Sequence, residues 1–440
     1  MKKILMTLAA VLCLYTACSD NGNDPVEQQL ADYTIIIYST GSGAQDSSVE
    51  KTWRETQTWL SDRKIRVLAV NKYGAGGESF TGKYGSPGEV VAFELNNDTD
   101  FETLHQEGAD MSDFKLYDPD NIVALLNRAK NEMPAKEYVL ALYGHAGGFD
   151  AYTDFPKPKT QPTRGVLSDE LLDQAKMNMY ELTEAIARSQ VKHLKALLFN
   201  NCLMGAMEVV TEVSSYTDYV IATPFMLTSE ESPLIPMLVK NLRQASDFET
   251  AARRTMSDSE AKLYEGYLKE GVPFNGNVEL LKSSELEAVC SAAKKLAARL
   301  CELYPTQQQA IDRATCQVYQ FYKSKTFYDL LDYARQLAAQ TADPQLTSIR
   351  DEMDEACHRA ILKQVNIDLG VLPTLPFYSL SVVIVDKEKY NSRKEGNNYT
   401  YRESYELNKF HRLTDWGTWL DANLSCPDGN PCGQGELTSN

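Results

Sequence analysis

The chain has 440 residues, of which 43% are hydrophobic and 24% are charged, and its formal net charge is -17. This hydrophobic content is ordinary for folded proteins and excludes disorder along the whole chain. The acidic balance argues against nucleic acid as a main partner, because phosphate binding requires clustered Lys and Arg. The 9 cysteines are too few for a disulfide scaffold.

Residues 1–17 are typical of a secretory leader: Lys2 and Lys3 precede an apolar stretch, and the small residues Thr16 and Ala17 end it. The apolar stretch is too short to cross a bilayer as a stable anchor. Cys18 directly follows the small residues, as in the lipobox of bacterial lipoproteins. We therefore predict a lipid on Cys18 that anchors the protein to a membrane of the bacterial cell envelope, facing the periplasm or the cell exterior. Residues 18–31 then form a flexible tether. The alternative is secretion without a lipid.

From residue 32 onward, apolar runs of strand length alternate with stretches of helical spacing. Unbroken apolar runs are typical of strands buried on both faces of a parallel sheet. The predicted strands are 33–38, 65–70, 138–143, 194–199 and 219–222, with a hairpin across 74–95 and further strands near 278–280 and 378–385. The predicted helices are 47–62, 118–133, 168–186 and 203–213, followed by helical patterns across 234–268, 283–303, 326–340 and 346–363.

This order predicts a doubly wound α/β sheet with a largely helical C-terminal extension. We divide the chain into an α/β core over 32–282, a helical region with a late strand over 283–424, and a tail over 425–440. Neither a P-loop nor a G-x-G-x-x-G motif follows the first strand, which disfavours nucleotide binding. The chain contains no G-x-S-x-G and no H-E-x-x-H motif, which disfavours a serine hydrolase and a zinc site. We predict neither a metal nor a cofactor.

Two predicted strands end in residues that can carry chemistry. The strand 138–143 runs into a glycine-rich turn that contains His145, and the strand 194–199 runs into a turn that contains Cys202. The carboxyl ends of parallel strands form the ligand crevice of such sheets, so we expect a Cys–His dyad there. The start of the predicted helix after Cys202 would favour its thiolate. Backbone N–H groups at Gly147 and Cys202 would hold an oxyanion. Taken singly, a cysteine or a histidine here is more often structural.

These two stretches, 138–149 and 198–209, resemble the clostripain family of cysteine peptidases. The likeness extends over residues 32–424, including the first strand, the segment 327–333 and Trp416. The resemblance implies a caspase-like α/β/α sandwich with a mostly parallel sheet. It also implies Cys202 as the nucleophile, His145 as its partner, and peptides or proteins as substrates.

The sequence departs from the family pattern near the expected substrate pocket. Asn200 stands where the family commonly has an Asp that favours Arg or Lys at P1, the substrate residue before the cleaved bond. An amide lacks the charge that pairs with a guanidinium, so we expect an altered P1 preference, with Asn200 and Thr223 as substrate-binding residues. The missing charge could come from Asp218, Glu230 or Glu231. Ala146 replaces the usual glycine after the histidine.

Family members are often activated by cleavage between the histidine and the cysteine. The polar loop 150–166 has the right position, and Lys157, Lys159 and Arg164 are the candidate cleavage sites. The alternative is an ordinary surface loop. A local disulfide between Cys426 and Cys432 is expected outside the cytoplasm, and Cys290, Cys301 and Cys357 are expected to be buried thiols. A second functional hypothesis is a non-catalytic binding protein that kept this fold, with Asn200 and Ala146 as signs of decay.

Overall fold

The computed structural model describes residues 30–39, 45–62, 64–74, 88–101, 109–110, 115–149, 163–169, 175–227, 232–271, 275–321, 326–370, 374–393 and 399–422. The predicted leader, most of the tether and the tail lie outside these residues, and so do several candidate side chains: Cys18, Lys157, Lys159, Glu230, Glu231, Cys426 and Cys432. The folded unit begins at Ala31.

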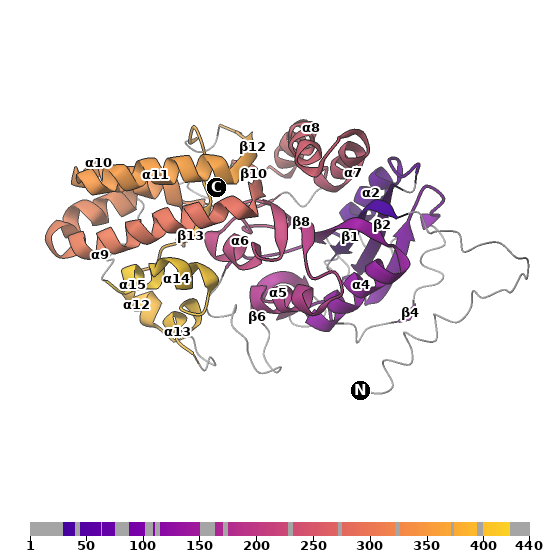
Figure 1. Cartoon of the computed structure of the whole chain (residues 1–440), viewed down its shortest axis with the longest axis horizontal. Coiled ribbons are helices and arrows are strands. Elements are labelled where there is room, and N and C mark those ends of the chain that lie inside the picture. The colour runs from indigo at the N-terminus through magenta and orange to yellow at the C-terminus, as the bar shows by residue number, and fades with distance from the viewer. Residues whose placement is uncertain are drawn as a thin grey trace, which may run out of the picture. The chain divides into compact units, whose positions relative to one another are not determined.

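A nine-stranded sheet, counted over the described residues, forms the centre of this unit in the order β12-β10-β9-β8-β5-β1-β2-β3-β4 (Figure 1). The five central strands run parallel, from β9 to β2, and antiparallel strands flank them on both sides. The strands are β1 (Ala31–Ser39), β2 (Ile65–Lys72), β3 (Glu89–Leu95), β4 (Ala109–Asp110), β5 (Ala135–Tyr143), β8 (Leu194–Asn200), β9 (Thr217–Ala222), β10 (Gly276–Lys282) and β12 (Ile361–Ile367).

The unbroken apolar runs are the reason for the parallel centre. Ile35, Ile36 and Ile37 are consecutive residues of β1, and all are buried. Because successive side chains point to opposite faces, both faces of this strand must be covered. Ile36 packs in one apolar core and its two neighbours pack in the other. The predicted central strands and the sandwich are therefore confirmed.

Helices cover both faces of the sheet, as the opposite placement of α4 and α8 in Figure 1 shows. One core is closed by α2 (Asp46–Gln57), α7 (Leu234–Gln244) and α8 (Phe248–Glu270). The other core is closed by α4 (Pro119–Glu132), α5 (Met179–Arg188) and α6 (Met207–Val213). The second core continues into the C-terminal region.

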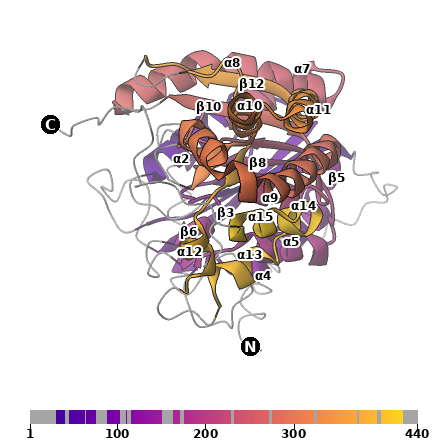
Figure 2. The same ribbon diagram turned by 90° about the vertical axis from the view of Figure 1, so that its left-hand side faces the viewer.

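The C-terminal region is built on α9 (Leu286–Gln317), which packs against α10 (Leu330–Thr341) and α11 (Pro344–Ala360). Figure 2 shows these three helices together, with α10 and α11 seen nearly end-on. The chain then returns to the sheet as its edge strand β12, so this region is helical but also completes the sheet. Its smaller elements are η2 (Ser283–Glu285), β11 (Phe327–Asp329), β13 (Ser381–Val383), α12 (Lys387–Asn391), α13 (Tyr401–Tyr405), α14 (Lys409–Thr414) and α15 (Trp416–Asp421).

The predicted helix over 168–186 is wrong in its first part. Residues 163–169 form β6, which pairs with β7 (Ala175–Lys176), and α5 begins only at Met179. A capping box sets this start: Asn178 Oδ1 accepts from the N–H of Glu181 at 2.8 Å, and Glu181 Oε2 accepts from the N–H of Asn178 at 3.0 Å.

Candidate active site

The neighbouring parallel strands β5 and β8 bring His145 and Cys202 to one edge of the sheet. The last register pair of the two strands is Tyr143 with Asn200. His145 and Cys202 each lie two residues beyond that pair, on adjacent strand ends. The His145 side chain is exposed, and Cys202 is 8% exposed. A thiol at the surface of the core therefore stands beside a histidine that solvent reaches.

The residues directly after Cys202 do not form a helix. Leu203 has a φ of 61°, which is uncommon and strained for a residue with a side chain. Its N–H donates to the carbonyl of Phe225 at 2.7 Å, and the N–H of Gly205 donates to the carbonyl of Thr223 at 2.8 Å. The helix predicted from residue 203 therefore begins at Met207 instead, because these backbone groups bond to the segment after β9.

That same segment also contacts the sulfur. The N–H of Leu227 lies 3.3 Å from Cys202 Sγ, and the carbonyl oxygen of the same residue lies 3.7 Å from it. The adjacent carbonyl of Met226 accepts a hydrogen bond from the hydroxyl of buried Tyr267. Burial, and then the charge at Cys202, raise the pKa of Tyr267 well above its ordinary value, so its hydroxyl remains a donor. Neither Leu227 nor Tyr267 lies in a motif, and sequence reasoning missed both.

The glycines after His145 have different surroundings. Gly148 has a φ of 66°, and a Cβ there would lie 2.8 Å from the carbonyl oxygen of Leu203 and 2.8 Å from the ring of Phe327. A Cβ on Gly147 would meet nothing within 4 Å. Gly148 therefore allows the close approach of the His145 turn to the Cys202 loop, while open space remains beside Gly147.

The predicted substrate-binding residues are buried beside the site. Asn200 is 5% exposed, and its Oδ1 accepts from the hydroxyl of Ser232 at 2.5 Å. The hydroxyl of Thr223 accepts from the N–H of Phe225 at 3.0 Å, so this side chain shapes its own turn. Asp218 pairs with Lys195 at 2.7 Å near the amino ends of β8 and β9, at the opposite edge of the sheet. The expectation that Asp218 could supply the missing pocket charge is therefore wrong.

The model of the clostripain family matches residues 85–418. The chain belongs to the clostripain family. No curated protein sequence matches it.

Solved structures support the fold of this clostripain-family protein. A secreted C11 cysteine protease from Bacteroides thetaiotaomicron, in complex with an irreversible peptide inhibitor, has a TM-score of 0.61 at 16% identity and covers 88% of this chain and 100% of its own. An inactive zymogen C11 protease from Parabacteroides distasonis has a TM-score of 0.57 at 16% identity and covers 88% of this chain and 99% of its own. The caspase-like sandwich is confirmed, and the chain is a cysteine peptidase.

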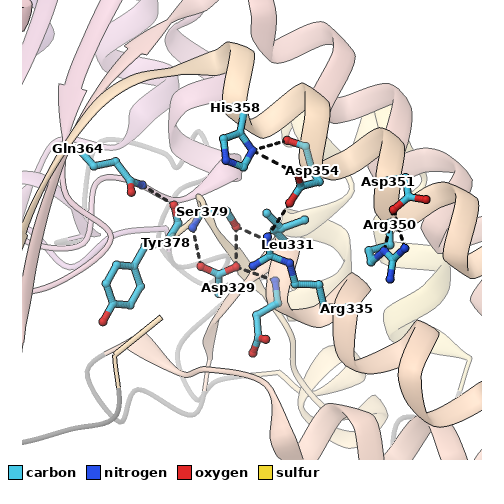
Figure 3. A network of polar contacts seen from close by, with 11 residues as sticks. Asp329, Leu331, Arg335, Arg350, Asp351, Asp354, His358, Gln364, Tyr378 and Ser379 are labelled. Carbon is cyan, nitrogen blue, oxygen red and sulfur yellow. Dashed lines mark hydrogen bonds and ion pairs between the residues drawn. The ribbon is translucent and has the colours of Figure 1, made fainter. Parts of the chain in front are cut away.

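The C-terminal region of this clostripain-family peptidase reaches the site through β11. Phe327, the first residue of β11, is the residue whose ring lies against Gly148. Two residues later, buried Asp329 accepts from the N–H of Ser379 at 2.6 Å and from its hydroxyl at 2.7 Å (Figure 3). It also caps α10 by accepting from the N–H of Asp332 at 2.8 Å. Burial raises the pKa of Asp329 to about 6 despite these bonds.

Glu208 links the same region to α6, the helix that follows the Cys202 loop. Its side chain is fully buried and accepts from the hydroxyl of Tyr405 at 2.7 Å and from the N–H of Val383 at 3.1 Å. Its second carboxylate oxygen, Oε2, has no hydrogen-bond partner among the residues that the structure describes. Burial raises the pKa of Glu208 to about 7, although the bonds from Tyr405 and Val383 lower it. The contact between α6 and β13 therefore runs through a buried carboxyl group whose pKa lies near neutral pH.

The described residues hold no group of three or more His, Cys, Asp or Glu side chains that could hold a metal ion. Within the same residues, no helix is long and apolar enough to cross a membrane. The free thiols Cys290, Cys316 and Cys357 are buried, whereas Cys301 is half-buried. The predicted buried thiols are thus confirmed for Cys290 and Cys357, and Cys301 is only partly covered.

Proposed function

We propose that this clostripain-family peptidase is an endopeptidase that cleaves peptide bonds through Cys202 and His145. The observation that carries the proposal is the placement of both residues two positions beyond the register pair of Tyr143 with Asn200. Family membership favours this enzyme over the alternative of a non-catalytic binding protein. Cleavage of a peptide library by the wild-type protein, mapped by mass spectrometry, tests the proposal, and an uncut library would contradict it.

The reaction follows from the groups at the two strand ends. The Cys202 thiolate attacks the carbonyl carbon of the substrate. Backbone N–H groups at Gly147 and Cys202 hold the oxyanion of the tetrahedral intermediate. His145 donates a proton to the leaving amine, and a C–S thioester remains on the enzyme. Water, deprotonated by His145, then hydrolyses the thioester and restores the thiolate.

The P1 preference follows from Asn200 and its neighbour Ser232. The Ser232 hydroxyl donates to Oδ1 of Asn200 and uses one of the two acceptor positions of that oxygen, while the amide nitrogen carries two donors. An N–H donor cannot pair with the donors of Arg or Lys, but it pairs with a side chain that carries an acceptor. We therefore place uncharged polar residues, such as Gln or Asn, ahead of Arg and Lys at P1.

The variant Asn200→Asp should convert this preference. A carboxylate at this position forms charge-assisted hydrogen bonds to a guanidinium, so kcat/KM for P1 Arg should rise about 10- to 100-fold. A fluorogenic panel that varies only P1 measures the change, and P1 Gln in the same variant is the internal control, which should not rise. A strong and exclusive preference of the wild-type enzyme for P1 Arg would contradict the assignment.

The lipid anchor and the processing event belong to the same proposal. Cys18, the first residue after the leader, is the lipidated residue, and the enzyme is held on the cell envelope outside the cytoplasm. Lys157, Lys159 and Arg164 are the candidate cleavage sites, and Arg164 lies on β6, which pairs with β7. The intact mass of protein extracted from membranes should show a lipid that Cys18→Ala lacks, and two fragments in place of one chain. A mass without a lipid would contradict the proposed anchor. An active protein that remains a single chain would contradict the proposed cleavage.

A further inference from the structure

Asn201 connects the two segments that carry the dyad. Its side chain is 1% exposed, and its Nδ2 donates to the carbonyl oxygen of Gly144 at 2.8 Å. The N–H of Gly144 in turn donates to the carbonyl of Asn200 at 3.4 Å. The carbonyl of Gly144 belongs to the peptide bond that leads into His145. The bond from Asn201 lies beyond the last register pair of β5 and β8, Tyr143 with Asn200, so the two strand ends stay joined after the sheet ladder stops.

The side chain acts here because the backbone of β8 is no longer available. After Cys202 the chain turns away from β5, and the N–H of Leu203 donates to the carbonyl of Phe225. Gly144 has a φ of 143°, a conformation that residues with side chains rarely adopt, so the chain also turns directly before His145. Two turns therefore diverge from the sheet at the same level. The bond from Asn201 sets the distance between them.

A purely structural role explains Asn201 poorly. Because a carbonyl oxygen only accepts, the bond to Gly144 fixes which end of the amide is nitrogen. The other end, Oδ1, is buried and has no hydrogen-bond partner in the described part of the chain. An unpaired buried acceptor lowers stability, and an apolar side chain of this size would avoid that cost. What an apolar side chain cannot do is hold the carbonyl of Gly144.

We infer that Asn201 is a positioning residue, which holds His145 at its working distance from Cys202 through the carbonyl of Gly144. The inference rests on the proposed peptidase function. It assigns no contact between Asn201 and the substrate. Without the bond, the His145 turn moves relative to the sulfur, and a displacement of about 1 Å at a reacting pair can cost about 100-fold in rate.

The first test is the variant Asn201→Ala, measured with a peptide substrate that the wild-type enzyme cleaves. We expect kcat to fall about 10- to 100-fold while KM changes less than about threefold, because the substrate still binds and only the dyad is displaced. The matched control is Asn241→Ala. Asn241 is 2% exposed and donates to Thr255 at 3.4 Å and to Asp258 at 3.2 Å, away from the two strand ends. This control should lose stability but keep its kcat within about twofold.

The second test uses a pH signature that a structural role would not produce. In Asn201→Asp the ionised carboxylate cannot donate to Gly144, whereas the protonated form can. Burial raises the pKa of such a carboxyl group, so protonation occurs in mildly acidic solution. The kcat of this variant relative to wild type should therefore recover as the pH falls from about 8 to about 5.

The outcomes separate this inference from the proposed function. A kcat for Asn201→Ala within about twofold of wild type, or an equal loss in Asn241→Ala, overturns the positioning role. If Asn201→Ala does not fold, an Asp variant whose relative kcat is flat with pH overturns it instead. Peptide hydrolysis that persists in Cys202→Ala would contradict the proposed peptidase mechanism, whatever the Asn201 variants show.

Discussion

Cys202→Ala should lower kcat for peptide hydrolysis by at least about 10⁴-fold, because removal of a covalent nucleophile leaves only binding and oxyanion stabilisation. Cys202 is only 8% exposed, but the substitution removes a single heavy atom, so the loss of stability should be small. Initial rates with a fluorogenic peptide measure the effect. His145→Ala should cost about 10²- to 10⁴-fold, the usual contribution of a positioned acid and base.

The matched control for this prediction is Cys301→Ala. Cys301 is another free thiol, half-buried on α9 and far along the chain from the two strand ends. Its removal should leave kcat within about twofold of wild type. Equal losses in Cys202→Ala and Cys301→Ala would show that thiol removal acts through stability, and the assignment of Cys202 as nucleophile would then be rejected.

Glu208→Gln should remove a pH dependence of stability that has a definite sign. Burial raises the pKa of Glu208 from 4.5 to about 7 in the folded protein. The folded state therefore binds more protons than the unfolded state between these values, and the free energy of unfolding falls as the pH rises from 4.5 to about 7. Above that range the contribution is constant. At about 1.4 kcal/mol for each pH unit, the change amounts to about 3 kcal/mol.

Urea unfolding of both proteins between pH 4.5 and pH 8 measures this effect. The difference between wild type and Glu208→Gln isolates Glu208, because Asp329 and other buried carboxyl groups titrate in both proteins. The variant should gain about 3 kcal/mol relative to wild type over this range. Glu212→Gln, on the same helix, is the matched control for the loss of one carboxyl group. A difference that does not vary with pH would show that Glu208 ionises in the folded protein at the same pKa as in the unfolded protein, and this would contradict the prediction.

Much of the sheet could be predicted because the sequence of each central strand is by itself sufficient to indicate a buried strand. Runs such as Ile35-Ile36-Ile37 are buried on both faces, and this requires nothing beyond the strand itself. The start of α5 was predicted too early, at residue 168, although Asn178 and Glu181 have the spacing of a capping box. The start of α6 could not be predicted from the sequence. It depends on bonds from the Cys202 loop to Thr223 and Phe225, and these form only when β9 lies beside β8.

The site could be predicted as far as strand order determines it. His145 and Cys202 follow neighbouring parallel strands, so their backbones must come together. The groups that hold them arrive from distant segments instead. Leu227 contacts the sulfur across 25 residues of chain, and Phe327 reaches Gly148 from the C-terminal region. The contact of Asn201 with Gly144 spans 57 residues, and no pattern in the sequence marks it.

The most direct test of the central claim is covalent labelling by a peptidyl acyloxymethyl ketone with an uncharged polar P1 residue, followed by peptide mapping with mass spectrometry. The probe reacts with a thiolate that is held beside a bound substrate. We expect a single adduct, on Cys202, that forms in wild type and is lost or strongly slowed in His145→Ala. Peptide hydrolysis that is blocked by an adduct on a different cysteine, while Cys202 stays unmodified, would contradict it.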